Sequence, residues 1–103
     1  MVGRLQKPEH VVASLTEQEK TLVQNLTGAD LQERVLRIWC AKEAAAKYLG
    51  LGLQGDPTLF EVSFLDDALN WAEVTYQMQS VAVSVALSNN YVLALAGQKR
   101  LVN

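Results

Sequence analysis

An alanine-rich segment at residues 37–50 constrains the fold of this chain more than any other part of the sequence. Its apolar residues are Ile38, Trp39, Ala45, Ala46 and Leu49. Their spacing is typical of a helix that packs against a small core. Three charged residues, Lys42, Glu43 and Lys47, interrupt the apolar run. Because an unpaired charge is costly beside a core, the sequence predicts that these charges have partners or serve a site.

The spacing of the three charges allows two interpretations. At about 100° per residue, Glu43 and Lys47 climb one stripe of the helix, and Lys42 points away from it. A glutamate four residues before a lysine stabilises a helix by a few tenths of a kcal/mol, so the pair needs no other purpose. A carboxylate beside lysines on a core helix also fits a site for phosphate and a metal ion. The long low-charge stretch around the triplet favours the second interpretation.

Size and composition exclude several classes of function. The 103 residues suffice for one small domain, and half of them are hydrophobic, which favours a folded core. A net charge of −2 is a poor match to nucleic acid. No apolar run approaches the roughly 18 residues that span a bilayer, so we expect no membrane partner. The single cysteine, Cys40, is expected to be a small buried hydrophobe, and no signal peptide is visible, which favours the cytoplasm.

The first half of the chain is predicted to hold two helices. Overlapping capping boxes that begin at Ser14 and Thr16 predict the start of a helix that runs to about Leu26. Asp30 is the predicted N-cap of a second helix over residues 31–49. Gly50 ends this second helix in our prediction. Arg34 and Arg37, on the second helix, are expected on a solvated face, with a carrier-protein contact as the alternative.

From Phe60 onward the hydrophobic pattern changes to the alternation of strands. The predicted strands lie near residues 60–64, 71–78, 81–87 and 91–96. We expect turns at residues 66–70 and 88–90, the second of them closing a hairpin. Two helices followed by several strands predict an α+β fold, with the helices packed on a small antiparallel sheet. The predicted domain covers residues 13–98, between a loose segment at 1–12 and a tail at 99–103.

The charged helix resembles the signature of a known enzyme family. Residues 39–47 match the W-x-x-K-E-A-x-x-K pattern of the 4′-phosphopantetheinyl transferases, and residues 47–53 match the K-x-L-G-x-G-L run that follows it. Residues 15–19 resemble the F-T-x-x-E helix start of the family. Residues 84–96 resemble its final hairpin, S-x-S-H-x-x-x-Y-A-x-A. The resemblance therefore extends from residue 15 to residue 96, over one family subdomain.

The resemblance implies an activity and a role for each matching residue. The family moves the phosphopantetheine arm of coenzyme A onto a serine of an acyl or peptidyl carrier protein, with Mg²⁺, in fatty acid or polyketide biosynthesis. By this resemblance Glu43 is a Mg²⁺ ligand or base, and Lys47 lies near the phosphates as the alternative base. Lys42 contacts the phosphate region or steadies Glu43. Gly50 and Gly52 are expected to border the coenzyme.

Two departures from the family pattern imply that the site is incomplete. Residues 1–12 contain no Gly-x-Asp, the family segment whose strand supplies a metal-binding aspartate, and the hairpin histidine is replaced by Asn89. The resemblance thus implies one lobe, completed by a second lobe or by self-association as a trimer or pseudo-dimer. The alternative is a non-catalytic docking or assembly module of a multidomain synthase. The intact Lys42, Glu43 and Lys47 favour the transferase.

Overall fold

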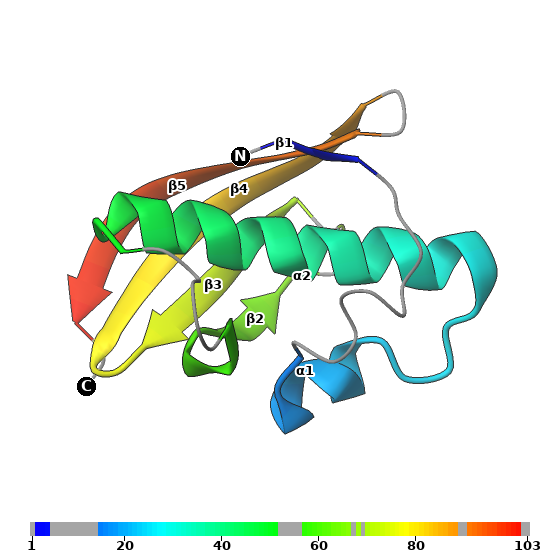
Figure 1. The fold of residues 1–103 in the computed structure, drawn as a ribbon, viewed down its shortest axis with the longest axis horizontal. Coiled ribbons are helices and arrows are strands. Elements are labelled where there is room, and N and C mark those ends of the chain that lie inside the picture. The colour runs from blue at the N-terminus through cyan, green and yellow to red at the C-terminus, as the bar shows by residue number, and fades with distance from the viewer. Residues whose placement is uncertain are drawn as a thin grey trace.

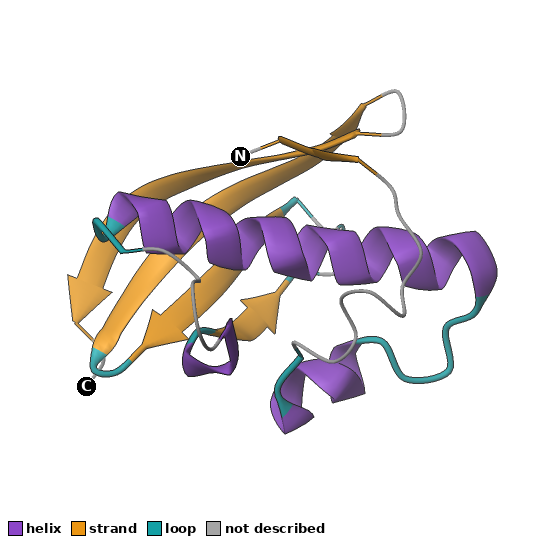
Figure 2. Ribbon diagram, in the orientation of Figure 1, coloured by secondary structure: helices purple, strands orange, loops and turns teal. Residues whose placement is uncertain are grey.

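The chain folds as two helices on a five-stranded antiparallel sheet (Figure 1). The computed structural model describes residues 2–4, 15–51, 57–66, 68, 70–88 and 91–101. The elements are β1 (Val2–Arg4), α1 (Glu17–Leu22), α2 (Gly28–Tyr48), a 3-10 helix η3 (Pro57–Leu59), β2 (Glu61–Leu65), β3 (Trp71–Tyr76), β4 (Gln79–Ser88) and β5 (Tyr91–Leu101). The strand order is β1-β5-β4-β3-β2, and the long helix α2 lies across the sheet (Figure 2). The predicted α+β class is confirmed.

The start of α1 follows the second of the two predicted capping boxes. Thr16 Oγ1 accepts a hydrogen bond from the backbone N–H of Glu19 at 3.1 Å. Glu19 Oε1 accepts from the backbone N–H of Thr16 at 2.9 Å, which completes the box. The helix ends at Leu22, one turn earlier than predicted. The competing box at Ser14 lies outside the described residues.

The helix α2 begins earlier than predicted and ends as predicted. Its N-cap is Thr27, which makes no side-chain cap bond, so the prediction of Asp30 as N-cap was wrong. Asp30 lies in the first turn, where its negative charge favours the positive end of the helix dipole. At the other end Gly50 has a φ of +77°. The N–H groups of Gly50 and Leu51 donate to Lys47 O and Ala46 O at 3.0 and 2.7 Å, which forms a Schellman motif.

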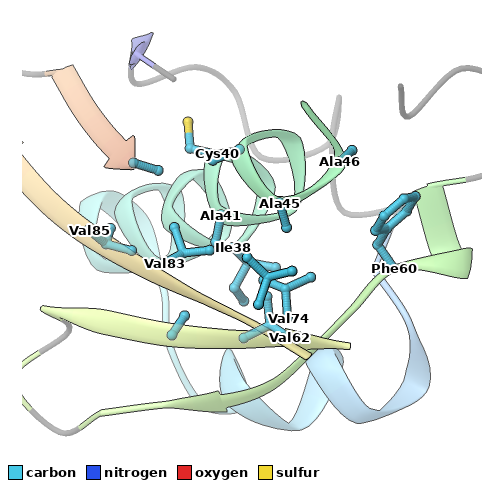
Figure 3. Packing of buried hydrophobic residues seen from close by; sticks show 14 of the residues in the cluster. Ile38, Cys40, Ala41, Ala45, Ala46, Phe60, Val62, Val74, Val83 and Val85 are labelled. Carbon is cyan, nitrogen blue, oxygen red and sulfur yellow. The ribbon is translucent and has the colours of Figure 1, made fainter. Parts of the chain in front are cut away.

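The core lies between α2 and the helix-facing side of the sheet. Small residues of α2, Ala41 and Ala45 among them, let the helix approach the strands closely. Figure 3 labels ten of these core residues: Ile38, Cys40, Ala41, Ala45, Ala46, Phe60, Val62, Val74, Val83 and Val85. Trp39, one of the apolar residues expected on the packed helix, lies against this core while remaining half-buried.

Both ends of the chain take part in the sheet, contrary to expectation. Residues 2–4 were expected to be loose, but they form β1 and pair with β5 in the register Val2↔Leu93. Residues 99–101 were expected in a tail, but β5 continues to Leu101, which pairs with Gln79. The predicted hairpin is consistent with the pairing Ser88↔Tyr91, although Asn89 and Asn90 themselves lie outside the described residues.

The face of the sheet opposite α2 exposes large apolar side chains. Along β3 burial alternates, so that Ala72 is buried and Trp71 is 40% exposed. Phe64 of β2 is 45% exposed, and its ring lies 4.8 Å from that of Trp71. The strand register continues this row through Ser84 to Leu95, which is 58% exposed. Apolar surface of this kind is typical of a face that another molecule covers.

Candidate active site

The helix α2 separates the three charges of the motif onto two sides. Lys42 is fully buried, Glu43 is half-buried and Lys47 is exposed. Glu43 and Lys47, four residues apart, therefore share the outer stripe of the helix, as helical geometry predicts. Only these two of the three side chains reach solvent. A ligand approaching α2 from outside meets one carboxylate and one ammonium group.

Lys42 has a buried partner on α1. Its Nζ donates to Glu19 Oε1 at 2.9 Å, and both side chains have 0% exposure. The other carboxylate oxygen, Glu19 Oε2, accepts from the backbone N–H of Val62 at 2.7 Å. The prediction that a charge on this helix requires a partner is confirmed here. The sequence had assigned Glu19 only to a capping box, and its place in the F-T-x-x-E resemblance was the available signal for a second role.

The expected contact of Lys42 with a phosphate stays a prediction. In this structure its side chain is turned into the interior, so an external phosphate does not reach the ammonium group directly. Steadying Glu43, the alternative role, is compatible with the observed position. The buried Glu19 makes that effect indirect, through the placement of the helix.

Glu43 and Lys47 do not form the helix-stabilising ion pair that was the simpler interpretation of their spacing. Among the described residues, the ion pairs are Lys20 with Glu17, Arg37 with Glu33 and Lys42 with Glu19. The two outward charges of α2 therefore do not pair with each other. This arrangement leaves both groups available to a charged ligand.

The carboxylate of Glu43 fits a magnesium ion that arrives with a phosphate. Within the described part of the chain, no group of three His, Cys, Asp or Glu side chains is placed to hold a metal ion. Proteins usually hold Mg²⁺ with one or two carboxylates, and substrate phosphates and waters fill the other positions. A single hard carboxylate beside an exposed lysine therefore suits Mg²⁺ bound together with a phosphate ligand, not a preformed cage.

Comparison with known proteins identifies the family. The sequence profile of the 4′-phosphopantetheinyl transferase superfamily matches residues 3–96. The chain belongs to this superfamily. A similar solved structure is a holo-(acyl-carrier-protein) synthase from Bacillus anthracis strain Ames in complex with CoA (3′,5′-ADP), with a TM-score of 0.69 and 24% identity over 95% of this chain and 93% of that chain. Comparison with curated proteins gave no match.

The family match corrects the view of the N-terminal segment of this phosphopantetheinyl transferase domain. The strand ahead of the first helix was expected to be missing, but β1 is present and lies inside the matched region. Its glycine, Gly3, is followed two positions later by Leu5 and not by an aspartate. Leu5 itself lies outside the described residues.

The glycines that follow α2 in the family pattern are only partly described. Gly50 adopts the left-handed conformation that closes the helix, and a side chain added there would meet nothing within 4 Å. This glycine is therefore required by backbone conformation and not by crowding. Gly52 lies outside the described residues. The predicted contact of both glycines with coenzyme A stays a prediction.

The two arginines of α2 are engaged within the domain and do not form the solvated face that was expected. Arg37 is buried, and its Nε donates to Glu33 Oε2 at 2.9 Å. Arg34 is half-buried, and its Nη1 donates to the carbonyl of Leu22 at 2.9 Å, which ties α2 to the end of α1. In this superfamily member Arg34 therefore links the two helices, and the pair of Arg37 with Glu33 lies within α2.

The one cysteine behaves as the sequence predicted. Cys40 is fully buried, and burial raises the pKa of its thiol to about 11. A nucleophilic cysteine requires a thiolate, so a role in catalysis is excluded by both access and protonation. No helix among the described residues is long and apolar enough to cross a membrane.

We expect the native domain to resist alkylation at Cys40. At pH 8 iodoacetamide should modify this thiol far more slowly in buffer than in urea, because reagent and thiolate meet only when the core opens. Mass spectrometry of timed samples measures the modified fraction. Equal rates in buffer and in urea would contradict the burial of Cys40 on the core-facing side of α2.

Proposed function

We propose that this chain is a phosphopantetheinyl transferase of the holo-acyl-carrier-protein synthase type. It transfers the phosphopantetheine arm of coenzyme A to a serine of an acyl or peptidyl carrier protein. The observation that carries the proposal is the arrangement on α2, where Glu43 and Lys47 face outward on one stripe and Lys42 anchors the helix inside. The cytoplasm, where carrier proteins are modified, is the proposed location.

The chemistry needs charge neutralisation and one proton acceptor. The serine oxygen forms a bond to the phosphorus that carries pantetheine, and the bond from that phosphorus to the bridging oxygen breaks, releasing 3′,5′-ADP. Lys47 places a positive charge beside the phosphates. Glu43 would hold Mg²⁺, which neutralises phosphate charge when bound. The serine proton passes to Glu43, directly or through a water. In the alternative, Lys47 accepts the proton as a neutral amine and gains its positive charge in that step.

Self-association is the proposed way in which the site is completed. The motif on α2 has one carboxylate, Glu43, and the position two residues after Gly3 holds a leucine. A single copy therefore offers few groups to the pyrophosphate. The exposed apolar row that includes Phe64, Trp71 and Leu95 offers a surface for a second copy. A second lobe supplied by another chain is the alternative.

The second candidate function is a non-catalytic docking or assembly module of a multidomain synthase. The observations that favour it are Leu5 in place of the aspartate and Asn89 in place of the hairpin histidine. Such a module would keep the fold and the core while losing transfer. It would have no requirement for Glu43 or Lys47.

Transfer of a labelled pantetheine arm tests the two candidates. The chain, a labelled coenzyme A and an apo carrier protein are incubated with Mg²⁺, and the label on the carrier is measured. We expect transfer whose specific rate rises with enzyme concentration, because self-association completes the site. A carrier with its acceptor serine replaced by alanine is the control.

The variant Trp71→Lys separates self-association from folding in the same assay. Placing a charge on the exposed row should lower both the sedimentation coefficient and the transfer rate, while the far-UV circular dichroism spectrum of the folded domain stays that of wild type. Absence of transfer at every concentration, with the domain folded, would favour the docking module. A specific transfer rate that stays constant as the enzyme is diluted from associated to single copies would reject self-association as the completing step.

A further inference from the structure

A buried carboxylate connects three elements beneath the charged stripe of α2. Glu19, on α1, accepts from Thr16 N at 2.9 Å, from Lys42 Nζ at 2.9 Å and from Val62 N at 2.7 Å. The donors belong to the start of α1, to α2 and to the strand β2. Glu19 and Lys42 both have 0% side-chain exposure. The carboxylate therefore fixes the position of α2 relative to α1 and β2 at one point.

That point is adjacent to the proposed chemistry. Lys42 directly precedes Glu43 in the sequence, and Lys47 follows little more than one turn later. Fixing the Lys42 side chain sets both the rotation of α2 about its axis and its height along β2. Because Glu43 and Lys47 extend from the same rigid helix, about 100° and 140° around its axis from Lys42, their directions are set by the same contact. A shift of the helix would move both groups together.

We propose that Glu19 is a positioning residue of the transferase site. It holds Lys42, and through Lys42 it orients Glu43 and Lys47 toward the pyrophosphate of the coenzyme. This inference rests on the proposed function. Glu19 touches no substrate and transfers no proton.

Stability alone does not account for this arrangement. Replacing a buried ion pair by well-packed apolar residues is often neutral or stabilising, so the pair is weak evidence for a purely energetic role. The backbone N–H groups of Thr16 and Val62 hold the carboxylate of Glu19, and its directional bond from Lys42 Nζ defines one register of α2. An apolar contact of the same volume tolerates small slides. Transfer between aligned phosphate and hydroxyl groups is sensitive to small slides, since a misplacement of about 1 Å can cost about 100-fold in rate.

The test compares an apolar pair with the ionic one. In Glu19→Leu/Lys42→Met the volume is kept and the register is lost. We expect the double variant to fold, kcat for transfer to fall by about tenfold or more, and the KM for coenzyme A to change much less. Calorimetric titration of Mg²⁺ into the variant saturated with coenzyme A should show weaker binding than in wild type, because Glu43 is displaced. If Glu19 and Lys42 served only to stabilise the fold, the folded double variant would bind Mg²⁺ as tightly as wild type does.

Two further variants keep the inference falsifiable. Glu19→Gln retains the shape, but its amide cannot accept from all three donors, so it should lower kcat in the same direction. Val83→Ala opens the core under the sheet without touching the stripe, and it should lower the thermal midpoint while kcat at 15 °C stays near wild type. A folded double variant with wild-type kcat and Mg²⁺ binding overturns the inference. A wild type that transfers nothing overturns the proposed function, and this inference with it.

Discussion

Glu43→Gln is expected to lower kcat for pantetheine transfer by about 10²–10⁴-fold, the range for removal of a general acid–base group. The substitution keeps the shape of the side chain and removes its charge. A neutral amide is a poor ligand for Mg²⁺ and accepts no proton at neutral pH, so both proposed roles of Glu43 are lost together. Steady-state transfer to an apo carrier protein measures the change.

The fold should survive this substitution. Glu43 is half-buried on the outer stripe of α2, and it makes no ion pair among the described residues. Changes at such positions usually alter the free energy of unfolding by about 0.5 kcal/mol or less. Urea denaturation of Glu43→Gln therefore distinguishes loss of chemistry from loss of structure.

The matched control is Glu17→Gln. Glu17 has 91% side-chain exposure and pairs only with the exposed Lys20 within the described residues, so the same change of charge touches neither α2 nor the core. Its transfer rate should remain within about twofold of wild type, as for a surface substitution away from the site. Full activity of Glu43→Gln beside a normal control would remove Glu43 as metal ligand and as base.

Local signals in the sequence predicted the elements on which the site is built. The capping box at Thr16 and the glycine stop at Gly50 depend on residues within one turn, and both are observed. The separation of Lys42 from Glu43 and Lys47 follows from helical geometry alone. These features were predictable because the forces that set them act over short stretches of chain.

The features that the sequence did not predict depend on distant partners. The three residues of β1 carry no strand pattern of their own, and their structure follows from pairing with β5. The polar character of residues 99–101 is typical of a tail, but these residues pair with residues 79–81 at the start of β4. Lys42 and its partner Glu19 are 23 residues apart in the sequence, so no helical rule relates them. Arg34 likewise reaches Leu22 on the preceding helix.

Lys42→Met is expected to lower the free energy of unfolding by about 3–5 kcal/mol, the cost of breaking a buried pair from one side. The variant leaves the carboxylate of Glu19 with 0% exposure and without its charged donor. Glu19→Leu should cost a similar amount, because it leaves a buried ammonium group and also removes the acceptor of Val62 N–H. Urea denaturation at one protein concentration measures both, since self-association would make the values depend on concentration.

The double variant decides what these single losses mean. If each loss arises from a buried charge that has lost its counter-ion, Glu19→Leu/Lys42→Met should be far more stable than the sum of the two changes predicts. Such a result would mean that the Glu19–Lys42 pair sets the register of α2 and adds little net stability, in agreement with a positioning role. Additive losses would instead mean that the ion pair is itself a main source of stability. Single losses under about 1 kcal/mol would indicate that water reaches Lys42 in solution, because exposed pairs contribute that little.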